Sequence, residues 1–376
     1  VVFSSEEDYA TSKSWTLTGG DGTKTVYVKY KDNLGNLSAS ISDTIILDTT
    51  PPTGTISINN GAQYTNSTSV TLILSASDAH SGVSKMQFSN DGVVFSSEEN
   101  YATSKSWTLT GGDGTKTVYV QYKDNAGNWS SSISDTITLD TTPPTGTISI
   151  NNGAQYTNST SVTLTLSASD AHSGVSKMQF SNDGVSFSPE ENYATSKSWT
   201  LTGGDGTKTV YVKYKNNAGD SSGPIGDTIT LDTTPPTGTI SINSGDGYTN
   251  SISVTLTLSA SDAHSGVSKM QFSNDGVVFS AEENYVTSKS WTLTTGEGLK
   301  TVYVQYKDNA GNWSSSISDT ITLDTTPPTG TISINNGAQY TNSTSVTLTL
   351  SASDAHSGVS KMQFSNDGVS FSPEEN

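Results

Sequence analysis

The sequence predicts an all-β protein in which tandem seven-stranded antiparallel β-sandwiches form an elongated rod. The first observation is an internal repeat: the string Asp-Thr-Thr-Pro-Pro-Thr-Gly begins at Asp48, Asp140, Asp232 and Asp324, always 92 residues apart. The second is the pattern inside one repeat, where short alternating runs rich in β-branched residues are separated by turn-forming residues. No window supports a helix of normal length, so the pattern fits a two-sheet sandwich.

The repeated string also predicts where the domains begin and end. Residues 51–142, 143–234 and 235–326 are three whole repeats, whereas residues 1–50 match the C-terminal half of a repeat and residues 327–376 match its N-terminal half. A half-sandwich exposes apolar faces and unpaired strand edges. We therefore expect each half-repeat to belong to a domain that is completed elsewhere, either by more of the same chain or by a neighbouring copy.

Seven strands are predicted in the repeat 51–142 from its alternating runs and the turns between them. Asn90-Asp91-Gly92 is a strong hairpin signal, because Asp-Gly between two alternating runs favours a tight turn. Further turns are predicted at 111–114 and 125–128. The predicted strands are, in order, 55–58, 69–76, 84–89, 93–95, 105–109, 117–123 and 134–139.

Substitutions between the repeats support the predicted strand register. Ile73 is Thr165 in the next repeat and Val94 is Ser186, and all of these positions have the outward parity of their strands. A shift of one residue would turn every side chain to the other face. The positions predicted to face inward do not change between copies: Ile56, Ile58, Val70, Leu72, Leu74, Ala76, Met86, Phe88, Val93, Phe95, Trp107, Leu109, Val118, Val120, Tyr122, Ile137 and Leu139.

Composition excludes several classes of function. The net charge is −18 and all 18 basic residues are Lys, so the chain lacks the positive surface and the Arg residues that bind phosphate backbones and read guanine. Nucleic acid is therefore not an expected partner. No apolar run approaches the ~20 residues of a membrane-spanning helix, so membrane insertion of this segment is not expected. The absence of Cys rules out disulfides and thiolate metal sites.

No group of residues has the pattern of an enzyme active site. Each repeat has a single His, such as His80, without a second His or a specifically placed Ser. Glu98 and Glu99 are adjacent, and adjacent residues on a strand point to opposite faces, whereas glycoside hydrolysis needs two carboxylates that face each other across a cleft. The sequence therefore predicts that this segment is not an enzyme.

Three segments of the repeat carry a resemblance to a known group of modules. They are 77–83 (Ser-Asp-Ala-His-Ser-Gly-Val), 118–128 (Val-Tyr-Val-Gln-Tyr-Lys-Asp-Asn-Ala-Gly-Asn) and 139–146 (Leu-Asp-Thr-Thr-Pro-Pro-Thr-Gly). On these segments the chain resembles bacterial immunoglobulin-like (Ig-like) and fibronectin type III-like tandem repeats of giant extracellular surface proteins, such as the stalks of adhesins or fibres. The resemblance implies Ig-like sandwiches, an extracellular or cell-surface location, and modules that calcium stiffens at Asp-Pro linkers.

Acidic residues are predicted to gather where one repeat meets the next, because the linker should enter beside the loop at 77–83 and the turn at 125–128. Calcium binds six to eight hard oxygens, several of them from carboxylates. The turn keeps one Asp and one Asn but exchanges their places between repeats, which favours a shared site; the alternative is that these residues only serve turns and caps. The candidate calcium ligands are Asp48, Asp78, Asp124 and Asn128 at the first junction, Asp140, Asp170, Asn216 and Asp220 at the second, Asp232, Asp262, Asp308 and Asn312 at the third, and Asp324 and Asp354 at the fourth.

The predicted function is mechanical: a structural spacer in a very long extracellular or cell-surface fibre or adhesin. Its expected partners are the neighbouring repeats of the same long chain, other copies in a filament, and surface glycans. The alternative is an array of carbohydrate-binding modules in which aromatic side chains such as Tyr119 and Trp129 stack on sugars. Trp129 is Ser221 and Leu37 in other repeats, which weighs against a dedicated sugar platform.

Overall fold

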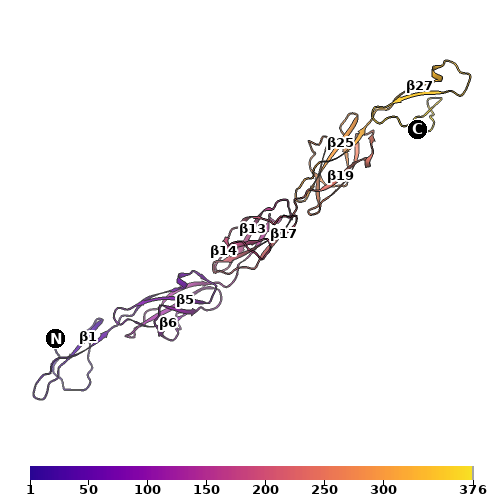
Figure 1. Ribbon diagram of the computed structural model, residues 1–376. Coiled ribbons are helices and arrows are strands. Elements are labelled where there is room, and N and C mark those ends of the chain that lie inside the picture. Colours follow the sequence, from indigo (N-terminus) through magenta and orange to yellow (C-terminus); the bar gives the residue numbers. More distant parts are fainter. Residues whose placement is uncertain (375–376) are drawn as a thin grey trace.

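The structure is a computed structural model that describes residues 1–374; residues 375–376, at the end of the predicted last half-repeat, lie outside the described residues. The chain forms a line of β-sheet modules, and its two termini lie at opposite ends of the molecule (Figure 1). The predicted fold class, an elongated array of tandem all-β sandwiches, is confirmed. Within the described residues, no helix is long and apolar enough to cross a membrane.

The first complete sandwich follows the linker that begins at Asp48. Six of the seven predicted strands lie close to observed strands, and a short 3-10 turn, η1 (Asn59–Gly61), follows the first strand. The strands are β3 (Thr53–Ile58), β4 (Tyr64–Thr65), β5 (Ser69–Ser77), β6 (Val83–Ser89), β7 (Glu99–Asn100), β8 (Ser104–Thr108), β9 (Gly114–Asp124) and β10 (Ile133–Leu139).

The same order of strands recurs in two further complete sandwiches. The second contains β11 (Thr145–Ile150), β12 (Tyr156–Thr157), β13 (Ser161–Ser169), β14 (Val175–Ser181), β15 (Glu191–Asn192), β16 (Ser196–Thr200), β17 (Gly206–Asn216) and β18 (Ile225–Leu231). The third contains β19 (Thr237–Ile242), η2 (Asn243–Gly245), β20 (Tyr248–Thr249), β21 (Ser253–Ser261), β22 (Val267–Ser273), β23 (Glu283–Asn284), β24 (Ser288–Thr292), β25 (Gly298–Asp308) and β26 (Ile317–Leu323).

Each complete sandwich packs a three-stranded sheet against a five-stranded sheet. In the first sandwich the strand orders are β3-β5-β8 and β4-β10-β9-β6-β7. The neighbouring strands pair in antiparallel fashion except β4, which pairs with β10 in parallel. The sequence predicts neither of the two-residue strands β4 and β7, which form the two edges of the five-stranded sheet.

The core lies between the two sheets and follows the predicted parity. Alternate residues of β9 and β5 are buried, and Leu72, Val118 and Tyr122 have no exposed surface. Ile73, predicted to face outward, is 38% exposed. The substitutions between repeats therefore fall on the solvent face, and the predicted register of these strands is confirmed.

The predicted strand at 93–95 is wrong. Val93 is 81% exposed, and the edge strand beside β6 is β7, further along the chain. The physical reason is that the Asp91 carboxylate accepts hydrogen bonds from the backbone N–H groups of Val93 and Val94, at 2.8 and 2.9 Å. Those donors are then not available for a β ladder, and Asp-Gly forms part of a wider loop here instead of a two-residue hairpin.

A glycine in the first strand of each sandwich makes room for a buried tyrosine. In the second sandwich, a Cβ on Gly146 would lie 2.4 Å from the Ser167 carbonyl oxygen and 2.6 Å from Tyr214 Cε2. The hydroxyl of the fully buried Tyr214 donates a hydrogen bond to the Thr147 carbonyl oxygen at 2.6 Å. This close approach ties the two sheets together, and burial raises the pKa of Tyr214 far above its ordinary value.

The two terminal segments form smaller sheets. β1 (Gly22–Val28) pairs with β2 (Ile41–Leu47), and β27 (Thr329–Ile334) pairs with β28 (Leu348–Ser353), with η3 (Asn335–Gly337) between the last two strands. Apolar side chains that are buried in complete sandwiches are exposed here: Ile45 is 58% exposed, whereas the equivalent Ile137 is 1% exposed. The reason is that no second sheet covers this face among the described residues.

Candidate metal centres at the repeat junctions

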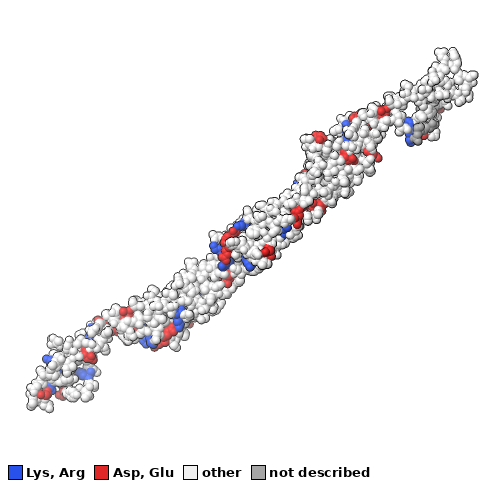
Figure 2. All heavy atoms as spheres, viewed as in Figure 1, with Lys and Arg blue, Asp and Glu red and all other residues white. Residues whose placement is uncertain are grey.

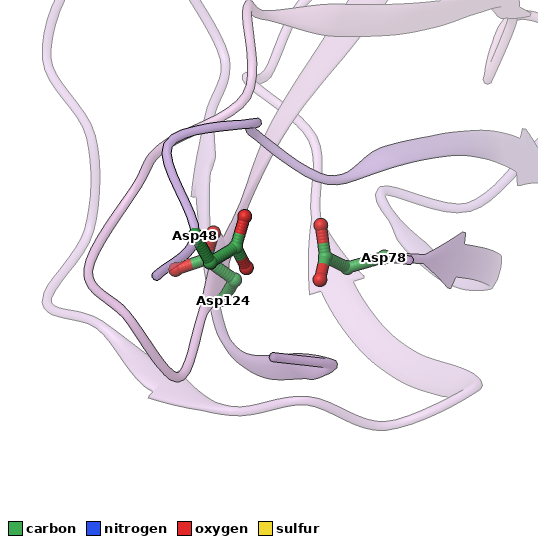
Figure 3. A group of neighbouring side chains, drawn as sticks. All are labelled: Asp48, Asp78 and Asp124. Carbon is green, nitrogen blue, oxygen red and sulfur yellow. The ribbon is translucent and has the colours of Figure 1, made fainter. Parts of the chain in front are cut away.

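The linker Asp of each repeat points into the pole of the next repeat. Asp48 follows β2, Asp78 follows β5, and Asp124 is the last residue of β9. One carboxylate oxygen from each of these residues lies within 4.8 Å of the other two. Figure 3 shows the three side chains gathered where the linker passes the loops of the sandwich. Carboxylates from two successive repeats therefore meet at the first junction, as the sequence predicts.

Backbone and amide N–H groups hold these three carboxylates in place. Asp78 Oδ1 accepts from the backbone N–H groups of the loop that follows it, and Asp124 Oδ1 accepts from the turn that follows β9. Asp48 Oδ2 accepts from Ser81 N at 3.1 Å, so the linker is hydrogen-bonded to the next repeat. Asn128 Nδ2 donates to Asp48 O at 3.0 Å and to Asp124 Oδ2 at 2.8 Å, so its amide nitrogen connects the linker backbone to the Asp124 carboxylate.

The first cluster has negative charge without a cationic side chain beside it. Asp48 and Asp124 are buried, and none of the ion pairs of the described residues includes Asp48, Asp78 or Asp124. Hydrogen bonds from the backbone, first that of His80, hold the pKa of Asp78 below its ordinary value, so this group is ionised at neutral pH. Like charges at this separation repel one another unless a cation lies between them.

The third junction repeats the arrangement of the first. Asp232, Asp262 and Asp308 bring their carboxylates within the same 4.8 Å limit, and Asp232 and Asp308 are buried. Burial alone would raise the pKa of Asp262, but the backbone N–H groups of Gly266 and its neighbours donate to the carboxylate and lower the pKa below its ordinary value. Asn312 Nδ2 donates to Asp232 O at 2.8 Å and to Asp308 Oδ2 at 2.7 Å.

The second junction has the same backbone geometry but a different residue at its centre. The last residue of β17 is Asn216 instead of Asp, and its amide nitrogen lies 3.1 Å from Asp140 Oδ2 and 3.4 Å from Asp170 Oδ2. The structure brings Asp140 and Asp170 together with Asn216, as predicted. The Asn216 amide, however, points its NH2 group, a hydrogen-bond donor, toward the two carboxylates. The Asp220 carboxylate instead accepts from Asn66 Nδ2 of the preceding sandwich at 3.1 Å.

The fourth junction contains two of the carboxylates. Asp324 Oδ2 accepts from Ser357 N at 3.0 Å, and Asp354 Oδ1 accepts from the backbone of the loop that follows β28. Hydrogen bonding, first from Ser357, lowers the pKa of Asp324 below its ordinary value. The strand that carries Asp124 at the first junction and Asp308 at the third has no counterpart at this junction in the described residues.

A second contact at each junction was not recognised in the sequence. Asp113, in the turn before β9, accepts hydrogen bonds from Thr141 N and Oγ1 at 3.0 and 2.9 Å and from Thr142 Oγ1 at 2.7 Å. Equivalent acids, Asp21, Asp205 and Glu297, contact the other linkers. The sequence contains one indication of this contact: in every repeat an acidic residue precedes the first linker threonine by the same number of residues.

Charge elsewhere on the molecule is sparse. Figure 2 shows small separate groups of acidic and basic side chains along the rod, with uncharged surface between them. Trp129, one of the aromatic residues considered for sugar binding, lies under the Lys123 ammonium, which is 5.3 Å from the centre of the indole ring. One face of this ring is therefore occupied by a side chain of the same sandwich.

Comparison with known proteins decides the family. The profile of the family described as bacterial Ig domain matches residues 52–120, 143–212 and 327–376. The chain belongs to the bacterial Ig domain family. The matched segments lie in the first sandwich, in the second sandwich and in the last half-repeat, and the predicted resemblance to bacterial Ig-like repeats is confirmed. No curated protein matched this bacterial Ig domain chain significantly.

Several solved structures are similar to this array of bacterial Ig domains at low sequence identity. One is described as a tetra-tandem repeat in the extending region of a large adhesion protein, with 20% identity, coverage of 81% of this chain and 82% of that chain, and a TM-score of 0.30. The fibronectin(III)-like modules of Clostridium thermocellum CbhA have 17% identity, coverage of 47% and 94%, and a TM-score of 0.31. The FN1-FN3 domains of chicken CNTN1 have 14% identity, coverage of 72% and 99%, and a TM-score of 0.28.

Proposed function

We propose that this bacterial Ig domain array is a structural spacer of a long extracellular or cell-surface protein, and that calcium stiffens its junctions. The observation that carries the proposal is the meeting of carboxylates from two successive repeats at Asp48 and Asp232. A metal ion held there would contact the linker of one repeat and the loops of the next. The array has the shape of a rod, and its neighbouring repeats are its partners in this role.

The donor set fits a hard divalent cation. The first cluster consists of carboxylate oxygens, without His or Cys among its three residues. Calcium takes about six to eight oxygen ligands, of which three carboxylates supply about three to six, and water completes the shell. Asp78 is only half-buried, so the cluster is open to water on its side.

The mechanical effect follows from the charges. Without an ion, the repulsion between the linker carboxylate and the two carboxylates of the next repeat favours conformations in which the linker swings away. With an ion, the same three groups become shared ligands, and the linker is fixed against the sandwich. Pro51 and Pro52 restrict the backbone beside this point, so a small number of contacts is enough to set the angle between repeats.

The test is small-angle X-ray scattering and thermal unfolding of the whole chain in calcium and in chelator. Calcium is expected to increase the maximum dimension and to raise the melting temperature, because an ion that binds the native state stabilises it by about 2.7 kcal/mol at a concentration of 100 times its Kd. Sites in extracellular modules typically have a Kd of about 10⁻⁴–10⁻³ M, so the titration must reach millimolar calcium.

A pair of isosteric variants separates the junction from general charge effects. Asp232→Asn removes one carboxylate of the third cluster and is expected to weaken the response to calcium. Asp246→Asn removes an exposed carboxylate in the repeat that supplies Asp262 and Asp308, outside the cluster, and is expected to leave the response unchanged. If the wild-type chain has the same dimension and melting temperature in millimolar calcium and in chelator, the calcium proposal is wrong and the linker alone sets the stiffness.

A further inference from the structure

We propose that the Asn216 amide takes the place of a cation at the second junction, so that the rod alternates between a metal-independent junction and calcium-dependent ones. The inference rests on the proposed function for the first and third junctions. The three complete sandwiches have Asp124, Asn216 and Asp308 at the same position of the same strand. The difference at Asn216 therefore changes the chemistry of one junction while the backbone around it stays the same.

The Asn216 side chain bridges the two repeats by itself. Its amide nitrogen donates to Asp140 Oδ2 and to the Thr142 carbonyl oxygen, both at 3.1 Å, and lies 3.4 Å from Asp170 Oδ2. Asp140 and Thr142 belong to the linker, whereas Asp170 belongs to the loop of the next repeat. The amide thus contacts linker and loop oxygens together, which is the role proposed for calcium at the neighbouring junctions.

The oxygen of the same amide keeps the turn in its usual form. Asn216 Oδ1 accepts from the backbone N–H groups of Gly219 and Asp220, both at 2.8 Å. Asp308 Oδ1 accepts the equivalent two hydrogen bonds at the third junction. An amide therefore replaces the carboxylate without loss of the turn. The one change is that the Nδ2 donor of Asn216 stands where Asp308 has the Oδ2 acceptor.

A serine hydroxyl supplies an independent second donor to the linker carboxylate. Ser173 Oγ donates to Asp140 Oδ2 at 2.5 Å, and Ser173 is 4% exposed. At the first junction the equivalent hydroxyl, Ser81 Oγ, is buried without a hydrogen-bond partner among the described residues. Asp140 Oδ2 accepts from Ser173 N, Ser173 Oγ and Asn216 Nδ2, so a cation would have to displace donors that are already in place.

The carboxylate exchanged for Asn216 is used in a second contact across the same junction. Asp220 Oδ1 accepts from Asn66 Nδ2, which lies in the loop after β4 of the preceding sandwich. At the third junction the equivalent positions are Asn158 and Asn312, where no carboxylate is present. The exchange of Asp and Asn therefore moves one negative charge from the centre of the junction to a contact with the preceding sandwich, which donates to it.

The first test counts the calcium ions bound by the whole chain, by isothermal titration calorimetry. Asn216→Asp with Asp220→Asn copies the turn of the neighbouring repeats, so it is expected to fold, and it should bind one more calcium ion than the wild type. Asp308→Asn with Asn312→Asp is the reciprocal exchange and should bind one fewer. An unchanged stoichiometry in both variants would overturn the inference while leaving the calcium proposal intact, and a wild-type chain that binds no calcium would overturn both.

The second test measures each junction separately. The chain has no Cys, so spin labels can be attached to Cys introduced at Val93, Val185 and Val277, which occupy the same position in successive repeats and are 81%, 82% and 81% exposed. Chelator is expected to broaden the distance distribution between labels at 185 and 277, across the third junction, and to leave that between 93 and 185 unchanged. Equal broadening of both distributions would contradict a metal-independent second junction, even if a variant for the first test failed to fold.

Discussion

The close approach of Gly146 to Tyr214 allows a sharp test of the sandwich packing. In Gly146→Ala, the new Cβ would lie 2.4 Å from the Ser167 carbonyl oxygen and 2.6 Å from Tyr214 Cε2. The first of these atoms belongs to the backbone of a paired strand, and the second belongs to a fully buried ring, so neither can move without disturbing the core. Overpacking of this kind costs about 1–3 kcal/mol.

The effect should be confined to one of the three complete sandwiches. For a domain of this size, 1 kcal/mol shifts the melting temperature by about 4–8 °C, so a cost of about 2 kcal/mol lowers the transition of one sandwich by about 8–16 °C. Differential scanning calorimetry of the whole chain should then show one transition separated from the rest. The control is Gly203→Ala in the same sandwich, where a Cβ meets nothing within 4 Å. If Gly146→Ala melts like this control, the account of a Tyr ring packed on a required glycine is wrong.

Three other perturbations have definite expected results. Tyr306→Phe removes the 2.7 Å hydrogen bond to the Thr239 carbonyl oxygen and should lower the free energy of unfolding by about 0.5–1.5 kcal/mol in chemical denaturation. Hydrogen bonds from the Ser89 hydroxyl and from the backbone N–H groups of Val93 and Val94 hold the pKa of Asp91 at about 2. The ionised Asp91 therefore contributes to the free energy of unfolding above the ordinary pKa of 3.8, and this contribution should be lost as pH falls toward 2. Denaturation curves at pH 5, 3 and 2 should then show a smaller loss of stability for Asp91→Asn than for the wild type, and an equal loss in both would contradict this account. Asp113→Ala removes the hydrogen bonds to Thr141 and Thr142 of the linker. It should broaden the spin-label distance distribution across the second junction both in calcium and in chelator. An unchanged distribution would show that this contact does not hold the linker in place.

The sequence by itself determined the repeat and most of the strand positions. A period of 92 residues without insertion fixes where equivalent strands must lie, and strict alternation in the segment 117–123 leaves a single face for the core. The same reasoning placed Asp48, Asp78 and Asp124 at one pole, because the ends of particular strands must meet where the linker enters. These features follow from local pattern and connectivity, which a sequence contains in full.

Only the tertiary structure decided the features that depend on where individual polar atoms point. The segment 93–95 has the alternation of a strand, but the Asp91 carboxylate takes its backbone donors and turns it into a loop. The exchange of Asp and Asn at 216 and 220 is visible in the sequence, where it predicts the same kind of calcium site at the second junction as at the first and third. In the folded chain the Asn216 nitrogen faces two carboxylates and Asp220 faces Asn66 of another repeat, because a hydrogen bond between distant segments depends on the positions of both partners in space.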